Sequence, residues 1–297
     1  LKCIEILGVK PDINDLRRTV PPCELSFSGI LREYQQIAVS DILKRDFGVL
    51  EAGTGSGKTV MALKVIAVRA QPAIVLVHTK ELLYQWAERI KQFLGVEAGL
   101  IGDGKCEIAP ITVAIVNSAK KYIHDLTPQF GHLLVDECHR VPASLFTDVV
   151  TSFDARYSLG LSATAYRRED SLTRLIYLYM GACVHKVDSV FLQESGAILK
   201  PEIILRATEF SYTYRDDYSA MLKTLAADEQ RNMLIARDVV THAGEVDGVL
   251  LVVSDRVAHC QRLAEIISES DVSVAVLTGK DPVEKRAEIV EKIRTNS

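Results

Sequence analysis

The 297-residue sequence lacks several features that would assign it to common protein classes. No apolar run approaches the ~18–20 residues that cross a membrane, and no signal-peptide pattern opens the chain. The six cysteines show no C-x-x-C spacing, which argues against a zinc site, an iron–sulfur cluster or a disulfide framework. The net charge of −4 does not predict a broad basic surface for nucleic acid. We therefore expect a globular, cytoplasmic protein without a membrane partner.

One glycine-rich segment indicates nucleotide binding. It joins a short apolar stretch at 47–51, expected to be a strand, to a segment of helical character from Thr59 onward. Closely spaced glycines allow backbone N–H groups to turn inward and contact phosphate oxygens. Lys58 would reach the β- and γ-phosphates of ATP, and the Thr59 hydroxyl would hold Mg²⁺. The predicted ATP-binding loop comprises Ala52, Gly53, Thr54, Gly55, Ser56, Gly57, Lys58 and Thr59, with Ala52 where the strict pattern has glycine.

An acidic pair follows a second apolar strand. Residues 132–135 are nearly continuous in apolar character, as expected for a central parallel strand. Asp136 and Glu137 come directly after it, at the strand end where ligands bind in open α/β sheets. We assign Asp136 to Mg²⁺ and Glu137 to orienting and deprotonating the attacking water, so that Lys58, Asp136 and Glu137 are the catalytic candidates. The alternatives are a solvated acidic turn and, for the loop, a β–α turn that binds nothing.

Strands and helices alternate from about residue 31. Strands are predicted at 73–78, 111–116, 131–136 and 157–161, and helices at 58–69, 79–93 and 144–150. This alternation predicts a parallel α/β sheet with helices on both faces.

A second, shorter alternation occupies the end of the chain. A buried strand is predicted at 248–254, another strand at 273–277, and a charged helix after it. The helix between the strands would present one apolar face, formed by Val257, Cys260, Ala264 and Ile267. We expect four regions: 1–30 without an assigned fold, an ATP-binding domain at 31–200, a linker at 201–230 with a strand-like stretch at 202–207, and a partial second domain at 231–297 that is cut short.

Four motifs in this order resemble a known family. They are Leu31-Arg32-Glu33-Tyr34-Gln35, the glycine-rich loop, Asp136-Glu137-Cys138-His139 and Ser162-Ala163-Thr164. Together they resemble superfamily 2 DEAD/DEAH-box helicases, most closely the XPB-like, UvsW-like and type III restriction-like members. Arg168-Glu169-Asp170 resembles the R-E-D triplet of XPB-like proteins. The resemblance implies a RecA-like ATP-binding domain followed by part of a second RecA-like domain.

The resemblance also implies roles for individual residues. Arg32 and Gln35 would contact adenine. Three residues would couple the nucleotide site to the cleft between domains, namely His139, Ser162 and Thr164. Contacts to the nucleic-acid backbone would come from Thr79, Lys80, Gly102, Asn117, Ser118 and Arg168. The alternative for His139 is a core histidine with satisfied hydrogen bonds, and for the residues that follow strands it is ordinary loop chemistry.

The leading hypothesis is therefore an ATP hydrolase of the helicase or translocase class that uses ATP and Mg²⁺, with DNA favoured over RNA. The motor of a restriction complex is a variant of it. A nucleotide-gated clamp that does not translocate is the main alternative, although Glu137 argues against it. A P-loop kinase is disfavoured by the D-E-x-H and S-A-T motifs. No motif after Gly279 resembles the one that carries an arginine finger, which predicts slow hydrolysis by this chain alone. Polarity, unwinding activity and oligomeric state stay open.

Overall fold

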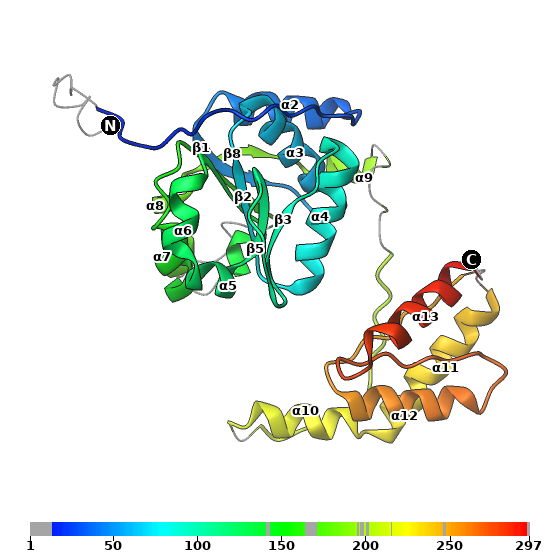
Figure 1. Cartoon of the computed structure of the whole chain (residues 1–297). Helices are drawn as coiled ribbons and strands as arrows, with labels where there is room; N and C mark the ends of the chain where they lie inside the picture. The colour runs from blue at the N-terminus through cyan, green and yellow to red at the C-terminus, as the bar shows by residue number, and fades with distance from the viewer. Residues whose placement is uncertain are drawn as a thin grey trace. The chain divides into compact units, whose positions relative to one another are not determined.

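The computed structural model describes residues 14–140, 143–163, 171–194, 196, 199, 202–214, 216–245 and 248–295. The chain divides into two compact units, Leu1–Pro201 and Glu202–Ser297 (Figure 1). Over these described ranges, no helix combines the length and the apolar character that a membrane crossing requires.

A single sheet forms the centre of the first unit. Its eight strands have the spatial order β4-β3-β5-β2-β6-β7-β1-β8, and every neighbouring pair is parallel except β3 with β4. The strands are β1 (Phe47–Glu51), β2 (Ala73–Val77), β3 (Gly99–Gly102), β4 (Lys105–Cys106), β5 (Ile111–Ile115), β6 (His132–Val135), β7 (Tyr157–Ser162) and β8 (Cys183–Lys186). The parallel pairing aligns the carboxyl ends of seven strands along one edge.

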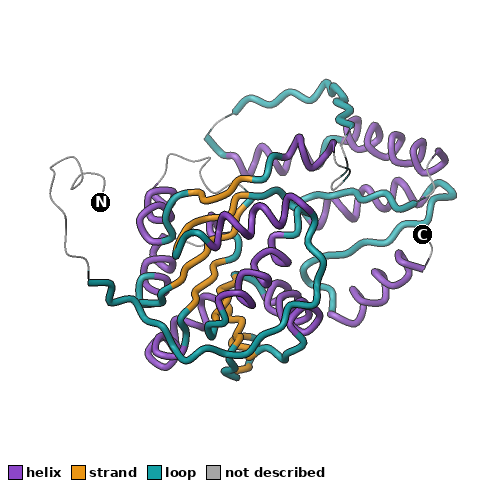
Figure 2. The backbone as a smooth tube through the Cα atoms, turned by 90° about the horizontal axis from the view of Figure 1, so that it is seen from above, coloured by secondary structure: helices purple, strands orange, loops and turns teal. Residues whose placement is uncertain are grey.

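Helices cover both faces of this sheet (Figures 1 and 2). One face packs against α2 (Glu33–Leu43), α3 (Lys58–Arg69) and α4 (Lys80–Leu94). The other packs against α5 (Val116–Lys121), α6 (Ile123–Leu126), α7 (Ala143–Val150) and α8 (Ser171–Tyr179). The remaining short elements are the 3₁₀ helices η1 (Thr127–Gln129) and η2 (Cys138–Arg140), and α9 (Ser189–Glu194).

Alternate residues of each central strand enter opposite cores. In β2, the Val75 side chain packs with α2–α4, whereas Ile74 and Leu76 pack with the helices of the other face. All five residues of β2 are fully buried, which explains its unbroken run of apolar residues. The predicted α/β sheet with helices on both faces is confirmed, as are the predicted strands and helices between residues 47 and 162, within one or two residues at their ends.

Residues 14–30, here called the N-terminal strap, cross the amino edge of the sheet. The strap begins beside β7, where Arg18 N donates to Asp154 O at 2.6 Å and Arg156 N donates to Arg18 O at 2.7 Å. Farther along, Cys23 N donates to Ala70 O at 2.8 Å. The strap then reaches α4, where the Phe27 ring stacks on Phe93 and Ser28 N donates to Phe93 O at 2.9 Å. No fold was predicted for this segment, and in the structure it packs against the sheet and helices of the first unit.

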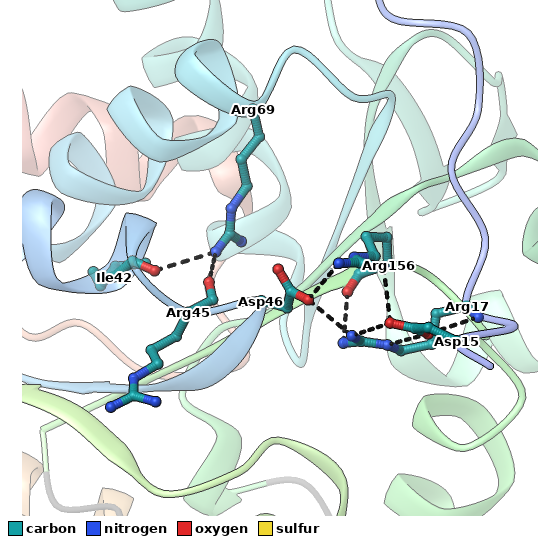
Figure 3. Close-up of polar contacts among 7 residues, drawn as sticks. All are labelled: Asp15, Arg17, Ile42, Arg45, Asp46, Arg69 and Arg156. Carbon is teal, nitrogen blue, oxygen red and sulfur yellow. Dashed lines mark hydrogen bonds and ion pairs between the residues drawn. The ribbon is translucent and has the colours of Figure 1, made fainter. Parts of the chain in front are cut away.

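Two arginines and two aspartates join the strap to the sheet (Figure 3). Asp46, which precedes β1, accepts from Arg17 at 2.8 Å and from Arg156 at 3.0 Å. Asp15 accepts from the same two arginines, at 2.6 and 2.8 Å. Hydrogen bonds from Arg17 hold the pKa of the Asp15 carboxyl well below its ordinary value. The four charges compensate one another at the start of the two neighbouring strands β1 and β7.

A half-buried arginine and a buried histidine lie at the same edge. Arg69 Nη1 lies 2.9 Å from His132 Nε2, and Arg69 Nη2 donates to Arg45 O at 2.7 Å. Burial lowers the pKa of Arg69 to about 10, which still leaves it charged at neutral pH. Burial, followed by the Arg69 charge, holds the pKa of His132 well below its ordinary value. His132 is therefore neutral, and its Nε2 accepts a hydrogen from Arg69.

The second unit contains four helices in its described residues. They are α10 (Tyr218–Ala226), α11 (Glu229–Glu245), α12 (Val257–Ser268) and α13 (Val283–Thr295). The strands predicted at 202–207, 248–254 and 273–277 are wrong, because none of these stretches forms a strand. Apolar character makes a stretch suitable for a sheet, but a strand needs a neighbouring strand to complete its ladder. None of the described residues of this unit supplies one, and Leu251 and Val253 are about four-fifths exposed.

The apolar face of α12 also differs from the predicted one. The buried side chains are His259, Leu263, Ile266 and Ile267, whereas Val257 is 43% exposed. Leu263, Ile266 and Ile267 pack with Ala236 of α11. His259 is held by Asn232, also of α11, whose Oδ1 lies 3.0 Å from His259 Nε2. Ile267 was predicted on this face and is buried, whereas the predicted Val257 is not. The prediction counted apolar residues alone, and the structure places a hydrogen-bonded histidine on that face.

The buried His132 predicts a pH dependence of stability. Below a pH of about 6.5 the unfolded chain takes up a proton at this residue and the folded chain does not, so unfolding becomes more favourable as the pH falls. Between pH 7 and pH 5, His132 should cost about 2 kcal/mol of unfolding free energy. The variant His132→Gln keeps an acceptor for Arg69 but does not titrate. Urea unfolding at both pH values should show a smaller loss in the variant; equal losses would contradict a neutral buried His132.

Candidate active site

The glycine-rich loop joins β1 to α3 at the carboxyl edge of the sheet. Gly55 and Gly57 have positive φ angles of 82° and 80°, a conformation that glycine adopts without strain. The loop is tied to the sheet by Ala52 N, which donates to Ser162 O at 2.9 Å. Within it, Ser56 Oγ donates to Gly53 O at 2.6 Å. The loop conformation is therefore set by its own sequence and by the end of β7.

Lys58, the first residue of α3, folds back over this loop. Its Nζ donates to Ala52 O at 2.8 Å and to Gly53 O at 3.3 Å. The half-buried Thr59 follows it in the first turn of the helix. An ammonium above a loop of backbone N–H groups, at the start of a helix, is an arrangement that attracts anionic phosphate.

The start of α2 lies against the loop. Tyr34 Oη donates to Ser56 O at 2.9 Å, and Gln35 Nε2 donates to the same oxygen at 3.0 Å. Gln35 Oε1 accepts from Arg32 N at 2.9 Å, and the Arg32 side chain is exposed. Gln35 therefore holds the loop in place, and its predicted adenine contact, with that of Arg32, stays a prediction. No role was predicted for Tyr34 from the sequence.

Asp136 is buried at the end of β6, and each of its carboxylate oxygens accepts a hydrogen bond. Oδ2 accepts from Trp86 Nε1 at 2.8 Å, and Oδ1 accepts from Glu137 N at 2.9 Å. Burial raises the pKa of the Asp136 carboxyl; the Trp86 hydrogen bond opposes this shift, and the nearby charge of Lys58 does so more weakly.

Glu137 and His139 form the turn after Asp136. Glu137 has a φ of +47°, which is uncommon for a residue with a side chain and marks local backbone strain. Its Oε2 lies 3.3 Å from His139 Nδ1, and the same nitrogen lies 2.8 Å from Ser162 Oγ. His139 therefore connects Glu137 to the end of β7. Thr164, the third predicted coupling residue, lies outside the described residues.

The predicted nucleic-acid contacts follow three neighbouring strands at the same edge. Thr79 and Lys80 follow β2, Gly102 ends β3, and Asn117 and Ser118 follow β5. Lys80 forms an ion pair with Asp103, and Thr79 caps α4 by accepting from Leu82 N at 3.2 Å.

Packing gives a reason for glycine at position 102, because an added Cβ there would lie 2.7 Å from a methyl carbon of Ile115. Asn117 is exposed. Arg168 lies outside the described residues. The role of these residues in binding nucleic acid stays a prediction.

The oxygen donors at this site fit a magnesium nucleotide. Thr59 supplies a hydroxyl and Asp136 supplies a carboxylate. Each Asp136 oxygen accepts one hydrogen bond and has a second lone pair that could bind a metal ion. Mg²⁺ is usually bound by one or two carboxylates together with substrate phosphates, so it does not need a cage of protein ligands. Among the described residues, no group of three or more histidine, cysteine or acidic side chains could hold a metal by itself.

Residues 28–167 match the family model described as "Type III restriction enzyme, res subunit". A DNA 3'-5' translocase XPB2 of Sulfurisphaera tokodaii is 35% identical over 156 residues, which are 52% of this chain and 35% of that protein. These similarities support the predicted membership of helicase superfamily 2.

A second relative matches along almost the whole chain. It is a probable helicase D10 of Escherichia phage T5, 25% identical over 99% of this chain and 64% of its own length. Among solved structures, the UvsW helicase of bacteriophage T4 aligns at 18% identity with a TM-score of 0.49, over 61% of this chain and 74% of that one. The chain spans about a third of the first relative and less than two thirds of the second.

The loop geometry predicts different outcomes for two glycine substitutions. Gly57 and Gly95 both have a positive φ, so alanine at either position should cost about 1 kcal/mol of unfolding free energy. An alanine Cβ at position 57 would also lie 2.5 Å from Gln35 Nε2, whereas at Gly95 nothing lies within 4 Å. Binding of a fluorescent ATP analogue should weaken more than tenfold in Gly57→Ala and stay unchanged in Gly95→Ala. Equal affinities in both variants would contradict the assigned role of the loop.

Proposed function

We propose that this protein is an ATP-dependent helicase or translocase that acts on DNA. The observation that carries the proposal is the single edge of the sheet on which the glycine-rich loop, the Asp136–Glu137 pair and the His139–Ser162 contact all lie. The similarity to a DNA 3'-5' translocase and to a probable phage helicase supports the choice of reaction.

ATP and Mg²⁺ are the proposed cofactors. The Lys58 ammonium would exchange its contacts with two loop carbonyls for phosphate oxygens, and Thr59 with Asp136 would hold the magnesium ion. Bound magnesium neutralises charge on the phosphates during phosphoryl transfer. Asp136 accepts hydrogen bonds from two fixed donors, so its carboxylate is oriented in advance.

Glu137 is the proposed base for the attacking water. Its side chain is one-quarter exposed, so water can reach it, and His139 Nδ1 lies 3.3 Å away. His139 Nδ1 has two oxygens within reach, Glu137 Oε2 at 3.3 Å and Ser162 Oγ at 2.8 Å. We propose that His139 exchanges between them when nucleotide binds. This would transmit the state of the site to β7 and the residues after it.

The proposal also includes the residues that would bind nucleic acid. Side chains that follow β2, β3 and β5 would contact the phosphate backbone beside the nucleotide site. Such contacts position a strand without reading its sequence, as a protein that moves along nucleic acid requires. DNA is favoured because the relative with the highest identity quoted above is named as a DNA translocase.

The test is MgATP turnover without polymer and with single-stranded DNA, duplex DNA or RNA. Stimulation by DNA that disappears in Lys58→Ala would support a DNA motor. Glu137→Gln should lower turnover about 10²–10⁴-fold, because it removes the base, while MgATP binding is kept. Absence of stimulation by every polymer, with intact nucleotide binding, would favour a nucleotide-gated clamp instead.

A further inference from the structure

The single tryptophan of the chain contacts the proposed metal ligand. Trp86 lies on α4, is 1% exposed, and packs in the core between α2–α4 and the sheet. Its Nε1 donates to Asp136 Oδ2 at 2.8 Å, across 50 residues of sequence. A buried indole N–H needs an acceptor, and any backbone carbonyl would serve. In this structure the acceptor is the one buried carboxylate of the D-E-x-H motif.

The hydrogen bond completes the orientation of this carboxylate. The other oxygen, Oδ1, accepts from Glu137 N at 2.9 Å, a contact between adjacent residues that any rotation of the turn would change. Because Trp86 Nε1 donates to Oδ2, the two oxygens of the Asp136 carboxylate are held by donors from different elements. The carboxylate plane is then fixed relative to α4 as well as to β6.

We propose that Trp86 is a positioning residue that sets the Asp136 carboxylate for Mg²⁺ and links it to α4. This inference rests on the proposed function of the site. This link leads from the metal ligand to the predicted nucleic-acid contacts, because Thr79 caps α4 and Lys80 is its first residue. Trp86 follows Lys80 by six residues, roughly 9 Å along the helix axis. A small movement of α4 on binding a strand would therefore reach the metal ligand through one hydrogen bond.

The first measurement uses the fact that the chain has one indole N–H. Protein labelled with ¹⁵N in tryptophan gives one side-chain resonance, which Trp86→Phe must remove. We expect this resonance to shift when Mg²⁺ and a non-hydrolysable ATP analogue are added together. We expect no shift with the analogue and EDTA. A resonance that does not respond to the magnesium complex, while the analogue is shown to bind, would overturn the proposal.

The second measurement separates positioning from a purely structural role. Trp86→Phe keeps an aromatic ring in the core and removes the donor. The Mg²⁺ concentration for half-maximal ATP turnover should rise about tenfold, as for other residues that orient metal ligands. Affinity for the analogue in EDTA should be unchanged. Tyr84→Phe is the matched control, because it removes one hydrogen bond of α4, from Tyr84 Oη to Asp103 at 2.9 Å, that does not involve Asp136.

The outcomes distinguish this inference from the proposed function. If the unaltered protein hydrolyses ATP and Trp86→Phe has the same magnesium dependence as Tyr84→Phe, only the positioning role is wrong. If the unaltered protein neither binds nor hydrolyses ATP, the proposed function is wrong and the inference fails with it. Circular dichroism and thermal unfolding of both variants establish that they are folded before these comparisons.

Discussion

Parallel pairing of β6, β7 and β1 is the constraint on which the site depends. Val135 lies opposite Gly160 of β7, and Ser162 lies opposite Glu51 of β1, so the three strands end at nearly the same level. The acidic motif, Ser162 and the glycine-rich loop follow these ends directly. Gly160 keeps the strands in this arrangement, because an added Cβ would lie 3.0 Å from Val49 and 3.3 Å from Cys138 Sγ. Residues more than 80 positions apart in sequence are thereby brought to one edge.

The parts of the fold that depend on residues close together in the chain could be predicted from the sequence. The unbroken apolar stretch at 73–77 has the length and composition of a central strand, and the structure buries it completely. The glycine-rich loop is determined by φ angles that few other residues adopt, so its course was predictable too. The strands β3, β4 and β8 were missed, because they are short and, unlike the equally short β6, carry no run of more than two large apolar residues.

Contacts between distant residues were not predictable from one sequence. Nothing local indicates that Trp86 donates to Asp136, or that Tyr34 donates to Ser56. In the second unit, by contrast, local patterns predicted strands that the structure does not contain among the described residues. Residues 248–254 have the composition of a buried strand, but composition does not supply the hydrogen-bonding neighbour. The helices α11 and α12 form regardless, since a helix completes its own hydrogen bonds.

The N-terminal strap has a practical consequence for where the first unit should be cut. The family model begins to match at residue 28, so a shortened protein designed from that match would start there. It would lose Asp15 and Arg17, leaving Asp46 and Arg156 to face each other without their partners, and would lose the stacking of Phe27 on Phe93. The amino ends of β1 and β7 would be uncovered, although every motif residue would still be present. A shortened form of the first unit should therefore keep the strap from Asp15 onward.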